Sequence, residues 1–265
     1  MSSFASSIAR SSPSGRPSDE IPGVLALGRG DVAEMFVSLS ARHPEGRDAE
    51  YLAWHTLDHR AEQHRLLEVR GSLRFVSTPA CRSARVAADP RYEATDHFMV
   101  YLFTDQAAMD SFYGLGEELF KAGRMPHRLP AVEGDLYTLA GKAAAPHAVA
   151  GADVLPWRPA LGAYLLVELG VAAADRLVDI DGVAGVWWAV SDLGRSMGYD
   201  WFVTPTSPDE GPKQVSLCFI DGDPVDAARR LQPILEKRWA DGLARPLLAA
   251  PFYSVVPYEW DRHLP

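Results

Sequence analysis

Residues 48–71 read DAEYLAWHTLDHRAEQHRLLEVRG, and this stretch decides how the rest of the chain is interpreted. Asp48 is placed to cap a helix, because its carboxylate can accept hydrogen bonds from the first free backbone N–H groups. We expect the helix to run to about Leu66 and a strand to follow over Gly71–Ser77. Histidines, carboxylates and a tryptophan crowd into these few helical turns. If the protein has a chemical site, we expect it on this helix.

The elements on either side of this helix complete a recognisable unit. Residues 31–40 alternate well enough for a strand that precedes the helix. After a long loop over residues 79–94, HFMVYLF (97–103) predicts a strand that is buried on both faces. A second amphipathic helix follows from Asp105 and stops at Gly123, and residues 134–140 form a fourth strand. The order is β-α-β-β-α-β, which is the ferredoxin-like unit.

The same order of elements recurs in the second half of the chain, with weak identity. We expect strands at 163–169, 183–190, 214–220 and 252–257, a short helix at 172–178, and a helix opened by Asp223-Pro224. The predicted organisation is a Ser/Pro-rich disordered tail (1–29), a first ferredoxin-like repeat that carries the candidate site (30–140), an Ala/Pro-rich connector (141–161), and a degenerate second repeat with a C-terminal extension (162–265).

Two such repeats in one chain can cover each other's open sheet faces. A ferredoxin-like sheet has helices on one face only, so strands that are apolar on both faces need a second sheet. We therefore predict an α+β fold of two tandem βαββαβ repeats packed sheet to sheet in a barrel-like arrangement. The space between the sheets could hold a small molecule. Strand parity offers Glu34, Arg74, Tyr101, Tyr137, Glu168 and Tyr253 to line it; the alternative is that they face solvent or pair with each other.

Composition excludes several classes of protein. The 265 residues carry a net charge of −9, and no clustered basic surface is evident, so a nucleic-acid partner is not expected. Two cysteines do not make a disulfide scaffold, which favours a reducing compartment and a cytoplasmic location. No run of about 20 apolar residues occurs, so we expect no membrane span.

The polar residues of the predicted helix suggest acid–base chemistry. Tyr51, His55, His59 and Glu62, with Asp58, fall within one stripe, since residues three and four apart share a helix face. A histidine beside a carboxylate can act as a general base, because the carboxylate fixes the tautomer and raises the basicity of the ring. We therefore predict His59 as the base, oriented by Glu62 or Asp58 and assisted by His55. The alternative is a solvated, charged helix face.

A metal site is a second interpretation of the same residues. His55 and His59 stand at i and i+4, and Glu62 could be a third ligand. Thr56, however, stands where the HExxH zinc-protease helix has its glutamate. We predict no metal and no organic cofactor. His97, at the start of a strand, is a further candidate for the cavity, and the loop around His127 could cover the ligand.

The motif W-x-x-x-x-H-x-x-E (Trp54, His59, Glu62), followed by a strand that contains Arg74, resembles the dimeric α+β barrel superfamily and, within it, the EthD-like group. In those families a Leu-Pro-Gly turn usually follows the helix, whereas residues 66–71 here read LLEVRG. The second half of the chain has no such motif. The resemblance therefore implies a fused pair of barrel units with one degenerate half, closed as an intramolecular dimeric α+β barrel.

Members of these families include cofactor-free monooxygenases, lactone isomerases and cyclases that hold small aromatic or unsaturated ligands. The resemblance implies an enzyme of isomerase, cyclase or monooxygenase type that acts by histidine acid/base chemistry on an apolar or aromatic substrate in the barrel cavity. The alternative is a non-catalytic protein that binds such a ligand. A homodimer of the fused barrel is left open. The expected substrate-binding residues are Trp54, Tyr51, Arg74, His97, Tyr101 and Glu34.

Overall fold

A computed structural model describes residues 32–191 and 211–264. The first half follows the predicted order of elements with three short additions between its second and third main strands. Its elements are β1 (Glu34–Ser40), α1 (Asp48–Trp54), the π-helical segment η2 (His55–His59), α2 (Arg60–Gln63), β2 (Val69–Val76), α3 (Pro79–Ala84), β3 (Val86–Ala87), the 3-10 turn η3 (Pro90–Tyr92), β4 (His97–Phe103), α4 (Ala108–Lys121) and β5 (Ala131–Ala144).

The second half has the same main strands but only one long helix among its described residues. Its elements are the 3-10 turns η4 (Pro146–Ala148) and η5 (Ala152–Trp157), β6 (Gly162–Leu169), the 3-10 turn η6 (Asp175–Asp179), β7 (Val183–Ser191), β8 (Lys213–Ile220), α5 (Pro224–Ala240) and β9 (Arg245–Ser254). Asp223 caps α5 as predicted, because its carboxylate accepts hydrogen bonds from the amides of Val225 and Asp226.

The strands form a large antiparallel sheet that closes on itself. Its order is β2-β4-β1-β5-β7-β8-β6-β9, with β3 beside β9, and the pairing of β2 with β9 closes the ring. Within each half, the first main strand lies between the third and the fourth, and the second lies outside the third. The fold is therefore α+β, with a few helices packed around one large sheet.

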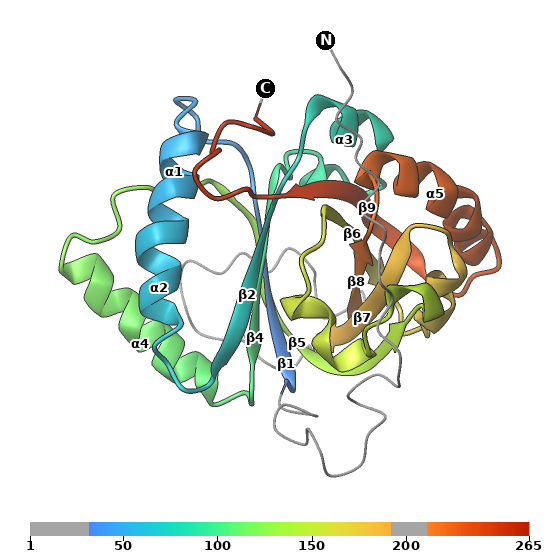
Figure 1. Ribbon diagram of the computed structural model, residues 1–265, viewed down its shortest axis with the longest axis horizontal. Helices are drawn as coiled ribbons and strands as arrows, with labels where there is room; N and C mark the ends of the chain where they lie inside the picture. Colours follow the sequence, from blue (N-terminus) through green and yellow to red (C-terminus); the bar gives the residue numbers. More distant parts are fainter. Residues whose placement is uncertain (1–31, 192–210, 265) are drawn as a thin grey trace.

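The helices lie on the outer face of the closed sheet. Figure 1 shows α1, α2 and α4 together on one side of the strands and α5 on the other. The strands of both halves send alternate side chains inward, where they form one continuous apolar core. This core includes Met35, Val37, Phe98, Trp187 and Phe252, each at most 1% exposed.

Buried side chains from both halves pack in the interior of the barrel, where the ligand space was expected. Tyr137 does face inward, but its hydroxyl donates to Glu133 Oε1 at 2.6 Å. Glu168 and Tyr253 also have partners: Glu168 accepts from Arg238 and Trp239, and the Tyr253 hydroxyl donates to Asp223 at 2.5 Å. For these residues the alternative interpretation holds: they pair with neighbouring side chains.

Four local predictions differ from the structure, and in two of these regions partners distant in sequence bind the charged side chains. Asp48 does not cap α1; its Oδ1 instead accepts from the His43 amide and from His97 Nε2. The long loop over 79–94 contains α3, β3 and η3, and arginines from this region bind the buried carboxylate of Asp96. In the second half β9 begins at Arg245 rather than at residue 252, and the helix expected over 172–178 is only a 3-10 turn.

Other predictions of organisation have not been tested. The tail predicted over residues 1–29 lies outside the described residues. The domain boundaries at 30, 140 and 162 remain predictions, since β5 and β7 pair across the connector within one sheet. In the part of the chain that is described, no helix is long and apolar enough to cross a membrane.

Candidate active site

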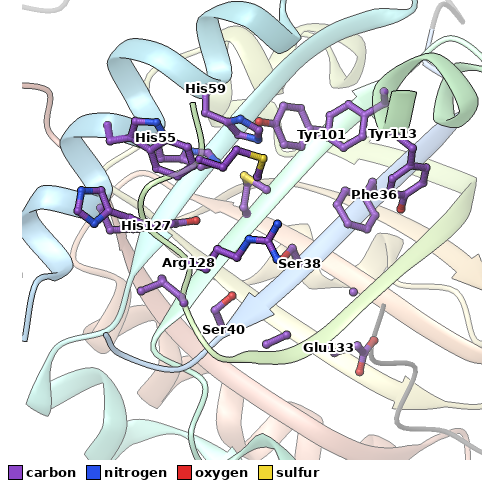
Figure 2. Close-up of a pocket in the computed structure, with 18 residues that line it drawn as sticks. Phe36, Ser38, Ser40, His55, His59, Tyr101, Tyr113, His127, Arg128 and Glu133 are labelled. Atoms are coloured by element: carbon purple, nitrogen blue, oxygen red, sulfur yellow. The ribbon is translucent and has the colours of Figure 1, made fainter. Parts of the chain in front are cut away.

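A pocket of about 390 Å³ lies between the outer face of the first half of the sheet and the helices that cover it. Its lining residues come from β1, α1, η2, β4, α4, the loop that leads into β5 and the first residues of β5, and Figure 2 shows the side chains around it. The walls are mostly aromatic or apolar, with a small number of polar groups, as is usual for small-ligand sites. The lining residues are Phe36, Ser38, Ser40, Tyr51, Trp54, His55, His59, Met99, Tyr101, Phe112, Tyr113, Met125, His127, Arg128, Leu129, Ala131, Glu133 and Gly134.

A π-helical turn places two histidines on the pocket wall. The segment η2 spans residues 55–59, and the Arg60 amide donates to the His55 carbonyl, which is an i to i+5 bond. Such turns are rare and occur frequently at functional sites. The rings of His55 and His59 lie 5.4 Å apart, and the indole of Trp54 stacks on His59 at 5.2 Å. The helix therefore presents both imidazoles to the pocket.

Burial keeps both imidazoles neutral. His55 is 2% exposed, and burial, with Arg74 and other nearby cations, lowers its pKa well below the usual value. Burial lowers the pKa of His59 to about 4, with the charge of Asp58 opposing this shift and that of Arg74 adding to it. At neutral pH both rings are uncharged, so each has one nitrogen that can accept a proton.

The hydrogen-bond partners of the imidazoles are incomplete. Among the residues described, neither His55 Nδ1 nor His59 Nδ1 has a hydrogen-bond partner. His59 Nε2 lies 3.2 Å from the amide nitrogen of Gln63, one helical turn further on. A side-chain amide can present either its oxygen or its nitrogen, so Gln63 is compatible with both tautomers of His59. Because buried polar atoms are nearly always paired, the open positions indicate a place for a ligand or water.

The predicted carboxylate partners of His59 are wrong. Asp58 and Glu62 lie on the outer side of the helix, where both bind the guanidinium of Arg124 at 2.6 and 3.5 Å. Neither carboxylate is hydrogen-bonded to the imidazole. Asp58 and Glu62, four residues apart, share the helix face that meets Arg124, whereas His55 and His59, also four apart, share the face toward the pocket, so the carboxylates point away from the imidazoles.

The structure brings some of the predicted substrate-binding residues together and not others. Tyr51, Trp54 and Tyr101 line the pocket, and the Tyr101 hydroxyl points toward His59 in Figure 2. Arg74 and His97 are buried behind the wall. His97 is bonded to Asp48, and the Arg74 guanidinium lies 4.7 Å from the Tyr51 ring. Glu34 lies outside the pocket and accepts from Thr138.

Several lining residues were missed in the sequence. Ser38 and Ser40 are polar residues in an otherwise apolar strand, and their shared parity could have indicated a polar patch on the helix side. The loop residues Met125, Arg128 and Leu129 carry no comparable signal. His127, in the same loop, also lines the pocket. Phe112 and Tyr113 looked like ordinary core residues of an amphipathic helix.

The described residues contain no group of three or more His, Cys, Asp or Glu side chains that could hold a metal ion. His55 and His59 do lie close together, but the proposed third ligand, Glu62, is bound to Arg124 and Arg65. The arrangement is therefore that of a largely aromatic pocket with two uncharged imidazoles on its wall, together with the cation Arg128 and the carboxylate Glu133.

No protein-family model and no curated protein matches the sequence. Solved structures do match. An anthrone oxidase-like protein aligns over 85% of this chain and 92% of its own, with 12% identity and a TM-score of 0.51. A candidate chlorite dismutase aligns over 88% of this chain and 100% of its own, with 10% identity and a TM-score of 0.49. A candidate monooxygenase from Fusobacterium nucleatum covers 85% and 93%, with 8% identity and a TM-score of 0.47.

These neighbours belong to the dimeric α+β barrel superfamily, to which the sequence motif pointed. At 12% identity the first of these alignments concerns the fold and not the chemistry. It agrees with the observed architecture of one large antiparallel sheet with helices on its outer face.

Proposed function

We propose that this protein is an enzyme that uses no organic cofactor and acts on a small apolar or aromatic substrate, with His59 as the general base. The observation that carries the proposal is the pair of buried, neutral imidazoles with open Nδ1 positions on the wall of an aromatic pocket. A neutral imidazole in such a place can accept a proton from a bound ligand. His55 assists by binding the substrate or by passing the proton on.

The chemistry begins with proton transfer from the substrate to His59. Gln63 supports it, because its amide oxygen can accept from the ring N–H when the other nitrogen takes the proton. The substrate is left as an anion, and Tyr101 can donate a hydrogen bond to it. Its hydroxyl is buried and has no hydrogen-bond partner among the described side chains. Isomerisation, cyclisation and oxygenation by dioxygen all start from such an anion.

Among these reactions, the monooxygenase type is favoured. The similar structures include an anthrone oxidase-like protein and a candidate monooxygenase, which supports an oxygenase on grounds of fold. The aromatic walls of the pocket suit a planar aromatic substrate, since Phe36, Trp54 and Phe112 can contact its faces and edges. Dioxygen would be the oxidant, and the deprotonated substrate would supply the electrons: one oxygen atom would bond to the substrate carbon, so that a CH2 group becomes C=O, and the other would leave as water with the two hydrogens removed.

The alternative, a non-catalytic ligand-binding protein, predicts an apolar cavity that no histidine reaches. The positions of His55 and His59 favour the enzyme, because both imidazoles lie on the wall rather than on the outer helix face. A binding protein also has no need for two desolvated bases, which cost stability in acid.

The test compares His59→Ala with His64→Ala. His64 lies one turn further on, outside the pocket. Binding of a panel of anthrones and hydroxylated naphthalenes is followed by tryptophan fluorescence, and turnover by oxygen uptake and product absorbance. His59→Ala should lose at least ~100-fold in turnover of any substrate found, as expected for a general base. His64→Ala should retain wild-type turnover. Undiminished turnover in His59→Ala would remove the proposal.

We further propose that the two halves of the chain are tandem ferredoxin-like repeats and that the first retains an EthD-like helix. The equal strand order in the two halves supports the duplication. The helix between β6 and β7 is reduced to η6, which agrees with a degenerate second repeat and with a site in the first half. Association of the closed barrel as a homodimer stays a prediction.

A further inference from the structure

A chain of buried polar groups lies behind the pocket wall and links α1 to β4 and β2. Asp48 Oδ1 is 2.7 Å from His97 Nε2, and His97 Nδ1 is 3.4 Å from Arg74 Nη2. All three residues are at most 6% exposed. They come from three elements and are 23 to 49 residues apart in sequence. A local structural need, such as helix capping, does not explain this arrangement.

The hydrogen bonds define the state of each group in the chain. Burial alone would raise the pKa of Asp48, but the hydrogen bonds from His97 and from the His43 amide outweigh it and lower the pKa. Asp48 is therefore a carboxylate, and His97 Nε2 carries the proton that it accepts. His97 Nδ1 is then free to accept from Arg74. The hydrogen bonds thus run from the Asp48 carboxylate through the neutral His97 imidazole to the Arg74 guanidinium, which is the end nearest the pocket.

Arg74 connects this series of hydrogen-bonded groups to the pocket. Its guanidinium lies 4.7 Å from the ring of Tyr51, which lines the pocket, and the Tyr51 ring lies 5.5 Å from that of His55. Among the described groups, no carboxylate forms a salt bridge with Arg74, and its Nε has no hydrogen-bond partner. Burial of a guanidinium without an ion-pair partner costs stability, so its presence here points to a role in the neighbouring site.

We propose that Asp48, His97 and Arg74 act together as positioning residues, which hold Tyr51 in place and keep His55 and His59 as neutral proton acceptors for the reaction. This inference rests on the proposed function, because it assigns these residues a task in the same site. None of the three lines the pocket, so they act through Tyr51 and through their charge.

The charges around the imidazoles agree with this role. Arg74 on β2 lowers the pKa of His55, His59 and His97, and burial is the larger cause in each case. The other groups that face His55 are Arg60 on α2, His97 on β4 and His59 on its own helix. Asp58 is the opposing charge near His59. Arg42 adds to the effect at His97, and Arg74 is the arginine whose charge acts on all three imidazoles.

The test uses ¹⁵N NMR of the imidazoles in the full chain without substrate, so it does not depend on catalysis. Arg74→Gln should move the titration midpoints of His55 and His59 to higher pH, whereas Arg70→Gln, an exposed change on the same strand, should leave them in place. Asp48→Asn should change the His97 signal from the Nε2–H form to a mixture of tautomers. Arg74→Lys keeps the charge and should retain low midpoints, which provides a variant if Arg74→Gln fails to fold.

Turnover gives the second measurement. Asp48→Asn and Arg74→Gln should each lower kcat at least ~10-fold at neutral pH, with KM changed much less, because neither residue lines the pocket. Unchanged midpoints in folded Arg74→Gln, or an unchanged His97 signal in Asp48→Asn, would overturn the inference. If the NMR changes occur but His59→Ala is fully active, the proposed function fails while the electrostatic link remains.

Discussion

The two halves of the barrel cover the same kind of sheet face in different ways. In the second half α5 lies directly on the sheet, and Ala227, Ala228 and Leu231 pack against strand residues such as Leu166 and Cys218. The small alanines let the helix approach closely. In the first half the corresponding layer leaves a pocket of about 390 Å³ under α1 and α4, walled by large aromatic rings. The same fold therefore supports a packed core on one side and a ligand site on the other.

The two faces also differ in how completely their buried polar groups are paired. On the second face the Glu168 carboxylate accepts from Arg238 and Trp239, and the Gln214 amide binds the backbone of Ala172 in both directions. On the first face, within the described residues, His55 and His59 have open Nδ1 atoms. The polar groups named on the second face are therefore paired within the protein, whereas the two imidazoles of the first face have unpaired nitrogens on the wall of a pocket.

The largest expected effect is a loss of stability in acid that originates in the first half. His59 and His97 each have a pKa of about 4 when folded, against 6.5 as the ordinary value, chiefly through burial. Between these values the unfolded chain binds protons that the folded chain does not, so stability falls as the pH falls from 6.5 to 4. Each imidazole should account for about 3 kcal/mol of the free energy of unfolding. Urea denaturation at pH 7 and pH 4 measures the fall.

The variant that isolates this effect is His59→Phe, which keeps a ring against Trp54. It should reduce the loss between pH 7 and pH 4 by about 3 kcal/mol, because one group that resists protonation has been removed. If His59→Phe loses as much free energy of unfolding between pH 7 and pH 4 as the wild type, burial does not hold His59 neutral. The two helix-facing sides of the sheet would then differ less than the structure indicates.

The sequence was sufficient for the parts of the fold and the site that depend on local patterns. The helix from Asp48, the Asp223 cap and the order of the main strands follow from periodicity and from turn chemistry. The motif residues Trp54 and His59 do line the pocket. Hydrophobic alternation and capping signals act within a few residues, so these features can be read without knowledge of the tertiary structure.

Features set by distant partners could not be predicted in the same way. Asp48 has the local signature of a cap, but His97, 49 residues away, binds its carboxylate. The ligand space was expected inside the barrel because β4 and β6 are apolar on both faces. Parity alone does not say which face meets helices and which meets the other half. Asp58 and Glu62 were assigned to His59 from local spacing, but both carboxylates bind Arg124, which lies 66 residues after Asp58.

A smaller effect should separate the packing of the two helix layers. Leu231 on α5 is fully buried in the second face, so Leu231→Ala should lower the free energy of unfolding by about 3 kcal/mol through lost burial and a new cavity. Leu129 borders the pocket, where a void already exists, and Leu129→Ala should cost less than about 1 kcal/mol. Urea denaturation at pH 7 gives both values. Equal losses would indicate that the pocket wall is packed as tightly as the core.

The smallest effect comes from a matched pair of serines on helix-facing strand positions. Ser38 on β1 borders the pocket, and Ser216 on β8 is fully buried and accepts from Gln214. Leucine at 216 must displace packed neighbours, so Ser216→Leu should cost about 2 kcal/mol, as overpacked cores do. Leucine at 38 extends into existing space, so Ser38→Leu should change stability by less than about 0.5 kcal/mol. Ser38→Leu should also weaken the binding of aromatic ligands that quench Trp54 fluorescence, because the leucine side chain occupies the volume that such ligands need. A Ser38→Leu protein that is destabilised as much as Ser216→Leu would mean that the first face is closed in solution, and the pocket could not serve the proposed reaction.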